Sequence, residues 1–219
     1  MKRISTKKLV MLAVIAALAF ASVSLIRIPA VLFLKYEPKD VFITLAGFIF
    51  DPLSSFAVSL VVSVVEMFTI SDTGIIGAIM NLISSCAFAC TASFIYKKAH
   101  NMKGAVIGLI SAIIVTTSVM LLWNYFMVPL YTPAFSRETV AGMLVPVFLP
   151  FNVIKGSINS ALILLVYKPI VTALRKARLL PSSQSVAPKN KKLSLGVTIV
   201  AIMVIITCVL FILSFQNII

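Results

Sequence analysis

The sequence predicts an all-α protein, a polytopic membrane bundle of six helices with a seventh transmembrane helix appended at its C-terminus. Of its 219 residues, 61% are hydrophobic, whereas the apolar share of a soluble domain is roughly 45–50%. The mean hydropathy is +1.13. Apolar runs recur at lengths close to the roughly 20 residues that cross a bilayer. The basic residues lie mostly between these runs, where they act as topology signals.

The apolar runs define the elements in chain order. The first helix is expected near 9–26, and it is retained, since no convincing cleavage site follows it. A polar stretch with prolines covers 27–40. Asp51-Pro52 then separates a short helix at 41–50 from the next at 53–70, because proline interrupts a helix. Further helices are expected at 75–96, 104–128, 146–174 and 193–215.

These elements group into one membrane domain and an appendage. Residues 1–178 hold the first six helices and leave no room for a soluble catalytic domain. Residues 179–192 are rich in Pro, Ser and Lys, which predicts a flexible basic linker. Residues 193–219 are expected to form the additional transmembrane helix.

The distribution of positive charge predicts the orientation. Of the 19 Lys and Arg residues, 14 fall on the side that holds the N-terminus and the segment between the fourth and fifth helices. The other side holds only Arg27, Lys35, Lys39 and Arg137. The positive-inside rule places the N-terminus in the cytoplasm of a multi-pass protein of the cell membrane.

This topology brings five polar side chains to one depth in the outer half of the membrane. They come from four helices and are Glu66, Asn81, Asn124, Asn152 and Lys155. Polar groups inside a membrane are costly and mark functional sites. The sequence therefore predicts a ligand pocket that opens outward.

The sixth helix carries the densest set of these groups. Asn152, Lys155 and Asn159 stand at i, i+3 and i+7, which is one helix face. They could instead join helices by hydrogen bonds, with Lys155 paired to Glu66. Asn159 is the deepest, and we expect its role to be structural.

Several classes of function are excluded. The net charge of +13 is spread over short loops, so no basic surface follows a nucleic acid. No phosphate-binding loop or catalytic constellation is present, and the single histidine is His100. Cys86, Cys90 and Cys208 lie in apolar runs and are expected to be free thiols. We therefore predict no enzyme and no metal site.

Two further features leave alternatives open. Ala13, Ala17 and Ala21 are spaced by four on the first helix, which suits either packing within the bundle or docking of another membrane protein. Phe33 to Tyr36 in the first outer loop could cap an apolar ligand, or could be a plain loop.

Several motifs together resemble the riboflavin-specific S component of energy-coupling factor (ECF) transporters, over residues 8 to 178. They are Phe33-Leu-Lys-Tyr-Glu-Pro-Lys-Asp40, Gly47-Phe-Ile-Phe-Asp-Pro52, Gly74-x-x-Gly77-x-x-x-Asn81, Asn124-Tyr-Phe126 and Leu149-Pro-Phe-Asn-Val-Ile-Lys-Gly156. The last two are the most specific. The seventh helix and the compact loop before the sixth helix depart from the family pattern.

The resemblance implies a six-helix protein that binds riboflavin from outside and associates with a T component and two ATPase subunits. Riboflavin is cargo, no cofactor is expected, and the partners use the ATP. In that family, residues of the last two motifs form hydrogen bonds to the flavin, so the resemblance assigns this role to Asn124, Asn152 and Lys155. It also implies main-chain contacts with the ligand at Leu34, Tyr36 and Gly77. The alanines of the first helix match the surface for the T component.

Two alternatives remain at this stage. The same pocket could take another planar vitamin or a nucleobase-like compound. From a different class, the protein could be a membrane scaffold or assembly factor whose polar residues only join helices.

Overall fold

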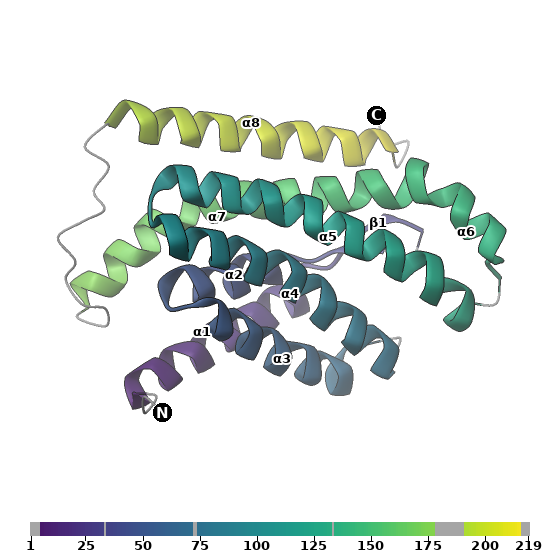
Figure 1. Cartoon of the computed structure of the whole chain (residues 1–219), viewed down its shortest axis with the longest axis horizontal. Helices are drawn as coiled ribbons and strands as arrows, with labels where there is room; N and C mark the ends of the chain where they lie inside the picture. Colours follow the sequence, from purple (N-terminus) through teal and green to yellow (C-terminus); the bar gives the residue numbers. More distant parts are fainter. Residues whose placement is uncertain (1–4, 33, 72–73, 133, 178–190, 216–219) are drawn as a thin grey trace.

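The computed structural model describes residues 5–32, 34–71, 74–132, 134–177 and 191–215 and is a helical bundle with one small hairpin (Figure 1). The elements in order are α1 (Thr6–Leu25), β1 (Ile28–Val31), β2 (Leu34–Tyr36), α2 (Lys39–Ile49), α3 (Pro52–Thr69), α4 (Gly74–Ala99), α5 (Met102–Tyr131), α6 (Arg137–Met143), a π-helical turn (Leu144–Phe148), α7 (Leu149–Lys176) and α8 (Lys191–Phe215).

Side-chain caps fix where several helices begin. The Asp51 carboxylate accepts a hydrogen bond from the Ser54 N–H at 2.9 Å, and Pro52 occupies the first turn of α3, where its missing N–H costs nothing. Asn101 caps α5 in the same way through the N–H of Gly104. The break at Asp51-Pro52 is therefore a helix start.

Within the described part of the chain, five helices are long and apolar enough to cross a membrane: α1, α3, α4, α5 and the continuous stretch Arg137–Leu174. The 11-residue α2 is too short, although most of it is buried. An apolar stretch in α8 covers Thr198–Val209. The expected helices are thus present, and residues 178–190 of the expected linker lie outside the described residues.

The structure differs from the expected elements in two places. The stretch 27–40 holds an antiparallel hairpin that pairs Ile28 with Tyr36 and Pro29 with Lys35. The sixth span begins near Arg137 instead of residue 146, because Ser136 caps a polar first turn that hydropathy does not detect.

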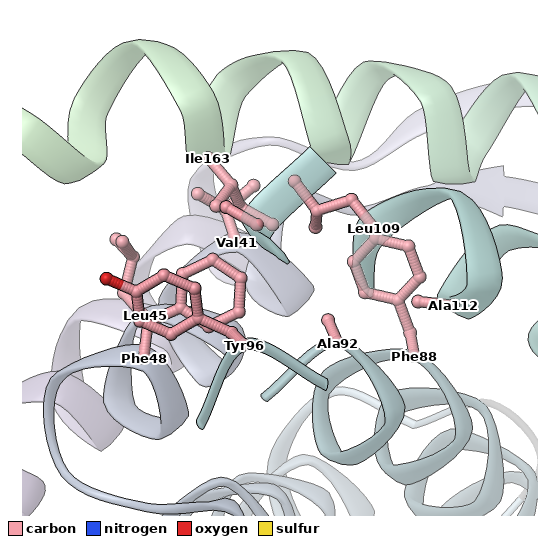
Figure 2. Close-up of a cluster of buried hydrophobic side chains, with 10 residues drawn as sticks. Val41, Leu45, Phe48, Phe88, Ala92, Tyr96, Leu109, Ala112 and Ile163 are labelled. Atoms are coloured by element: carbon pink, nitrogen blue, oxygen red, sulfur yellow. The ribbon is translucent and has the colours of Figure 1, made fainter. Parts of the chain in front are cut away.

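The main core lies where α2, α4, α5 and α7 meet. Figure 2 shows the ring of Phe48 against that of Tyr96, and the two centroids are 4.3 Å apart. The Tyr96 and Tyr167 hydroxyls lie 2.7 Å apart, which joins α4 to α7. Leu109 and Ile163 complete the contact from α5 and α7 (Figure 2).

A second core joins α1 to the rest of the bundle. Ala19 packs with Ile43, Ala46, Val58 and Val62 of α2 and α3. In Figure 1, α1 and α8 lie at opposite edges of the bundle, with α8 beside α7. The helix appended at the C-terminus therefore leaves α1 uncovered.

Candidate functional site

A cavity of about 620 Å³ lies among α4, α5 and α7, bounded by the β1–β2 hairpin and the segment after α5. Its lining residues are Arg27, Leu32, Leu34, Lys35, Glu37, Ser71, Ile76, Gly77, Met80, Asn81, Ser84, Met120, Asn124, Thr132, Phe135, Phe151, Asn152 and Lys155. Most of the wall surface is apolar, and three asparagines and four charged residues interrupt it. An apolar wall with placed polar groups is the usual build of a small-molecule site.

Each of the three helices divides its length between this cavity and the main core. On α4, Gly77 to Ser84 line the cavity, whereas Phe88 to Tyr96 belong to the core. On α7, Phe151 to Lys155 line the cavity and Ile163 lies in the core. The cavity therefore occupies one end of the bundle, and the packed core closes the other end.

The local structure before α7 explains how Asn152 reaches the cavity. The Leu149 N–H donates to the Leu144 carbonyl in a π-helical turn, and Pro146 and Pro150 each remove one helical donor. The Asn152 Nδ2 donates to the Phe148 carbonyl at 2.8 Å. This bond leaves the side-chain oxygen of Asn152 available to a ligand.

Asn124 on α5 is the most unusual group in the wall. Its side chain is 1% exposed, and neither Oδ1 nor Nδ2 has a hydrogen-bond partner among the described residues. A buried amide without partners costs roughly 1–3 kcal/mol. Asn124 therefore lines the cavity with one acceptor and two donors that have no partner among the described residues.

Lys155 pairs with Asp40 and not with Glu66, the partner that the alternative, helix-joining interpretation gave it. The Lys155 Nζ lies 3.5 Å from Asp40 Oδ2, and the side chain, which lines the cavity, remains partly exposed. Glu66 is already bound at 2.6 Å by Lys39, the residue next to Asp40 in the chain. The short α2 supplies both partners, which the spacing of α3 and α7 alone does not reveal.

A chain of charges lies beside the cavity and ties the hairpin to α3 and α4. Arg27 Nε donates to Glu37 at 2.9 Å, and Glu37 lies 3.0 Å from the Lys39 ammonium. Lys39 in turn donates to Glu66, which also accepts from Asn81 Nδ2 at 2.8 Å. The bond to Glu66 leaves the side-chain oxygen of Asn81 for a ligand.

This chain of charges changes the acidity of Glu37, which lies between β2 and α2, outside the membrane-spanning helices. Burial alone would raise the pKa of its carboxyl group. The charges of Lys39 and Lys155, with hydrogen bonds from Arg27 and Lys39, outweigh burial and lower the pKa from 4.5 to about 2. Glu37 is therefore ionised near neutral pH.

The structure brings most of the predicted site residues to one cavity. Its wall contains Leu34, Gly77, Asn81, Asn124, Asn152 and Lys155. Tyr36 and Glu66 lie behind the wall: the Tyr36 hydroxyl donates to Asn159 at 2.9 Å, and Glu66 binds Lys39. Phe33 lies outside the described residues.

Sequence reasoning missed the polar groups at the start of α2. Asp40 accepts from Ser85 at 2.6 Å and contacts Lys155, while Arg27 and Glu37 line the cavity. The missed signal was a Glu-Pro-Lys-Asp sequence directly before an apolar helix. Charges at such a position need buried partners when the helix packs in a core.

The structure also describes the alanines of α1, the cysteines and the candidate metal ligands. Ala13 and Ala17 are exposed and Ala21 is half-buried, so the first two do not pack within the bundle. The three cysteines, half-buried, are free. Among the described residues, no cluster of His, Cys, Asp or Glu could hold a metal ion.

Comparisons with known proteins agree with one another. Residues 7–167 match the family model for the substrate-specific component of ECF transporters. The chain is 31% identical to riboflavin transporter RibU of Staphylococcus aureus over 78% of this chain and 93% of that protein. It is 29% identical to riboflavin transporter FmnP of Bacillus subtilis over 79% and 98%.

A solved structure, described as the S component of a bacterial ECF transporter, shares the fold. The TM-score is 0.65 at 32% identity, and the match covers 77% of this chain and 98% of that one. The range matched by the family model ends before α8.

Proposed function

The chain belongs to the substrate-specific components of ECF transporters, and from this premise we propose that it captures riboflavin outside the cell for uptake. Its relatives are named riboflavin transporters, and its cavity offers polar groups suited to a flavin. The observation that carries the proposal is the buried amide of Asn124, which has no partner among the described residues.

The hydrogen-bonding groups of the cavity match the chemistry of a flavin. The pyrimidine ring of riboflavin has an N–H between two carbonyl groups, and the ribityl chain has hydroxyls. Asn124 can both donate and accept, Lys155 can donate, and Asn152 and Asn81 each keep a side-chain oxygen as an acceptor. Together these residues can form hydrogen bonds with a ligand that has alternating donors and acceptors along one edge.

The apolar part of the wall suits the flat tricyclic ring. Leu34 of the hairpin, Met80 of α4, Met120 of α5 and Phe151 of α7 all line the cavity. Its volume of about 620 Å³ falls within the range of roughly 300–1,000 Å³ that holds small molecules. An aromatic ligand replaces water against these side chains.

The distribution of positive charge supports an orientation with the N-terminus in the cytoplasm and the cavity facing outward. Directed uptake then requires partners, because the sequence carries no phosphate-binding loop. We propose a T component and two ATPase subunits for this role. Exposed Ala13 and Ala17 on α1 support docking of the T component on that helix, with Ala21 at its edge.

A competition experiment tests the ligand. Purified protein loaded with radiolabelled riboflavin is challenged with unlabelled riboflavin, lumiflavin, thiamine, biotin and guanine, and the label that stays bound is counted. We expect unlabelled riboflavin to compete best and lumiflavin to compete less well, with no effect of the others. Displacement by thiamine, biotin or guanine at lower concentration than riboflavin would assign the cavity to a different compound.

A further inference from the structure

Asp40 of α2 is a buried carboxylate that contacts α4 and α7 without lining the cavity. It lies in the first turn of α2 and is 2% exposed. Its Oδ1 accepts from the Ser85 hydroxyl of α4 at 2.6 Å. Its Oδ2 lies 3.4 Å from Asn159 Nδ2 and 3.5 Å from Lys155 Nζ, both on α7.

Asn159 connects this carboxylate to the hairpin. The Tyr36 hydroxyl of β2 donates to Asn159 Oδ1 at 2.9 Å, while the amide nitrogen of Asn159 faces Asp40. Both ends of the amide are thereby used, so Asn159 has a fixed orientation. The position of Asp40 is consequently set from α4 by Ser85 and from the hairpin through Asn159.

Among the contacts of the Asp40 carboxylate described above, Lys155 is the one that also lines the cavity. A lysine has four rotatable side-chain bonds, and holding it in one conformation costs side-chain entropy. A fixed anion beside the ammonium offsets that cost before a ligand arrives. At 3.5 Å the pair is close enough for electrostatic restraint, and the Lys155 side chain, which is partly exposed and lines the cavity, can still donate to a ligand.

We propose that Asp40 is a positioning residue that holds the Lys155 ammonium ready to donate to the bound flavin. The inference rests on the proposed function, because it concerns the riboflavin site. Asp40 itself does not touch the ligand. Its effect on riboflavin affinity is therefore exerted through Lys155 and disappears when Lys155 is absent.

A double-mutant cycle with Asp40→Asn and Lys155→Met tests this dependence. Asparagine keeps the size of the side chain and an oxygen for Ser85, but it removes the charge. We expect Asp40→Asn to weaken riboflavin binding by roughly five- to fiftyfold in the wild-type background, in the range of couplings between residues in contact. In the Lys155→Met background, the same change should alter binding less than twofold.

Asp51→Asn is the matched control, because Asp51 also pairs with a lysine, Lys8 at 2.6 Å, but this lysine does not line the cavity. It should leave riboflavin affinity unchanged. Asp40→Asn should also change the absorption band of bound riboflavin, a readout that a loss of stability alone would not move. Equal loss of affinity in both backgrounds would overturn the positioning role.

If Asp40→Asn does not fold, a second variant tests the same positioning role. Ser85→Ala loosens Asp40 without altering its charge, and it should lower affinity a few-fold only when Lys155 is present. An effect independent of Lys155 would again overturn the inference. Absence of riboflavin binding by the wild-type protein would instead contradict the proposed function.

Discussion

Asn124, a proposed ligand-binding residue, illustrates how such a group can lower the stability of the empty protein. Its amide lies in the cavity wall without partners among the described residues, and α5 holds it there within an otherwise apolar helix. Buried polar groups of this kind are tolerated where a ligand supplies the missing hydrogen bonds. The residue is therefore expected to favour binding at the expense of the free protein.

Replacing Asn124 with leucine separates these two effects. We expect riboflavin affinity to fall by about 1–3 kcal/mol, because the ligand loses its hydrogen bonds. The melting temperature of the ligand-free protein should stay equal or rise, because the desolvated amide is gone. Titration and thermal unfolding in detergent measure the two quantities.

Thr117→Val is the control for Asn124→Leu. The Thr117 hydroxyl is also buried and unpartnered among the described residues, but the residue does not line the cavity. The ligand-free protein should be equally stable or more stable, with affinity unchanged. A large loss of stability in Asn124→Leu would show that the amide has a structural partner.

Glu37 provides a prediction about pH. Its pKa of about 2 in the folded protein lies below the ordinary 4.5. A carboxyl group with a lowered pKa stabilises the folded state above its unfolded pKa, and this stabilisation is lost as the pH falls through the folded pKa. The contribution is thus complete above pH 4.5 and disappears toward pH 2.

The difference in melting temperature between wild type and Glu37→Gln should reveal this contribution. We expect wild type to be the more stable by a constant amount between pH 5.5 and 8, and the difference to shrink below pH 4.5. The exposed Glu138→Gln serves as the control. A difference that grows with acidification would contradict the assigned ion pairs.

At the scale of elements, α2 is the piece that joins the site to the core. Its first turn supplies Lys39 and Asp40 to the buried ion pairs, and its last turns pack against α3 and α4. Gly47 allows this close approach: a Cβ atom there would overlap the hydroxyls of Ser93 and Ser55. These two hydroxyls lie 3.3 Å apart at the contact of α3 with α4.

Gly47→Ala is therefore expected to destabilise the protein by about 1–3 kcal/mol, as overpacking of a core does. Gly142→Ala is the control, because nothing lies within 4 Å of the added methyl group. This control should be neutral or slightly stabilising, since alanine favours a helix. Thermal unfolding in detergent compares the two, and similar melting temperatures would contradict the close packing of α2.

The sequence predicted the long elements well and the short ones poorly. Apolar runs mark α3 to α5 because a membrane span requires about 20 apolar residues. The hairpin has no comparable sequence pattern, because β1 and β2 have only four and three residues. Arg27, directly before β1, helps to fix the hairpin by donating to the Ile70 carbonyl at 2.8 Å. That contact joins residues 43 positions apart.

The candidate site, too, was predictable from the sequence only in part. Their depth in the membrane and the family resemblance predicted that four residues share one site. The structure places these residues in one cavity wall: Asn81, Asn124, Asn152 and Lys155. The partner of Lys155 could not be predicted, because two acidic residues compete for it and only the packing of α2 decides between them. Local sequence reports which groups are polar, whereas ion pairing depends on the tertiary structure.

At the scale of the whole molecule, the cavity and the proposed partner surface are separate. The cavity lies among α4, α5 and α7, whereas the exposed alanines lie on α1, at the edge opposite α8 (Figure 1). Binding of riboflavin and docking of a T component should therefore be separable by mutation. The position of α8 beside α7 leaves the alanines of α1 accessible.

Ala17→Trp tests this separation, because a bulky ring on the exposed alanine surface prevents close helix contact. We expect cellular riboflavin uptake to be lost in the presence of the T component and ATPases, while the purified variant binds riboflavin normally. Ile114→Trp, at an exposed position of α5, is the control and should retain uptake. Loss of binding and uptake together would contradict the assignment of the docking surface.

Equilibrium titration of the purified wild-type protein with riboflavin tests the central claim most directly. Contact with aromatic and polar side chains in the cavity should quench flavin fluorescence. The account predicts saturable quenching with one riboflavin per chain, weakened in the Lys155→Met variant. Absence of saturable binding at micromolar riboflavin would contradict the claim that this cavity is a riboflavin site.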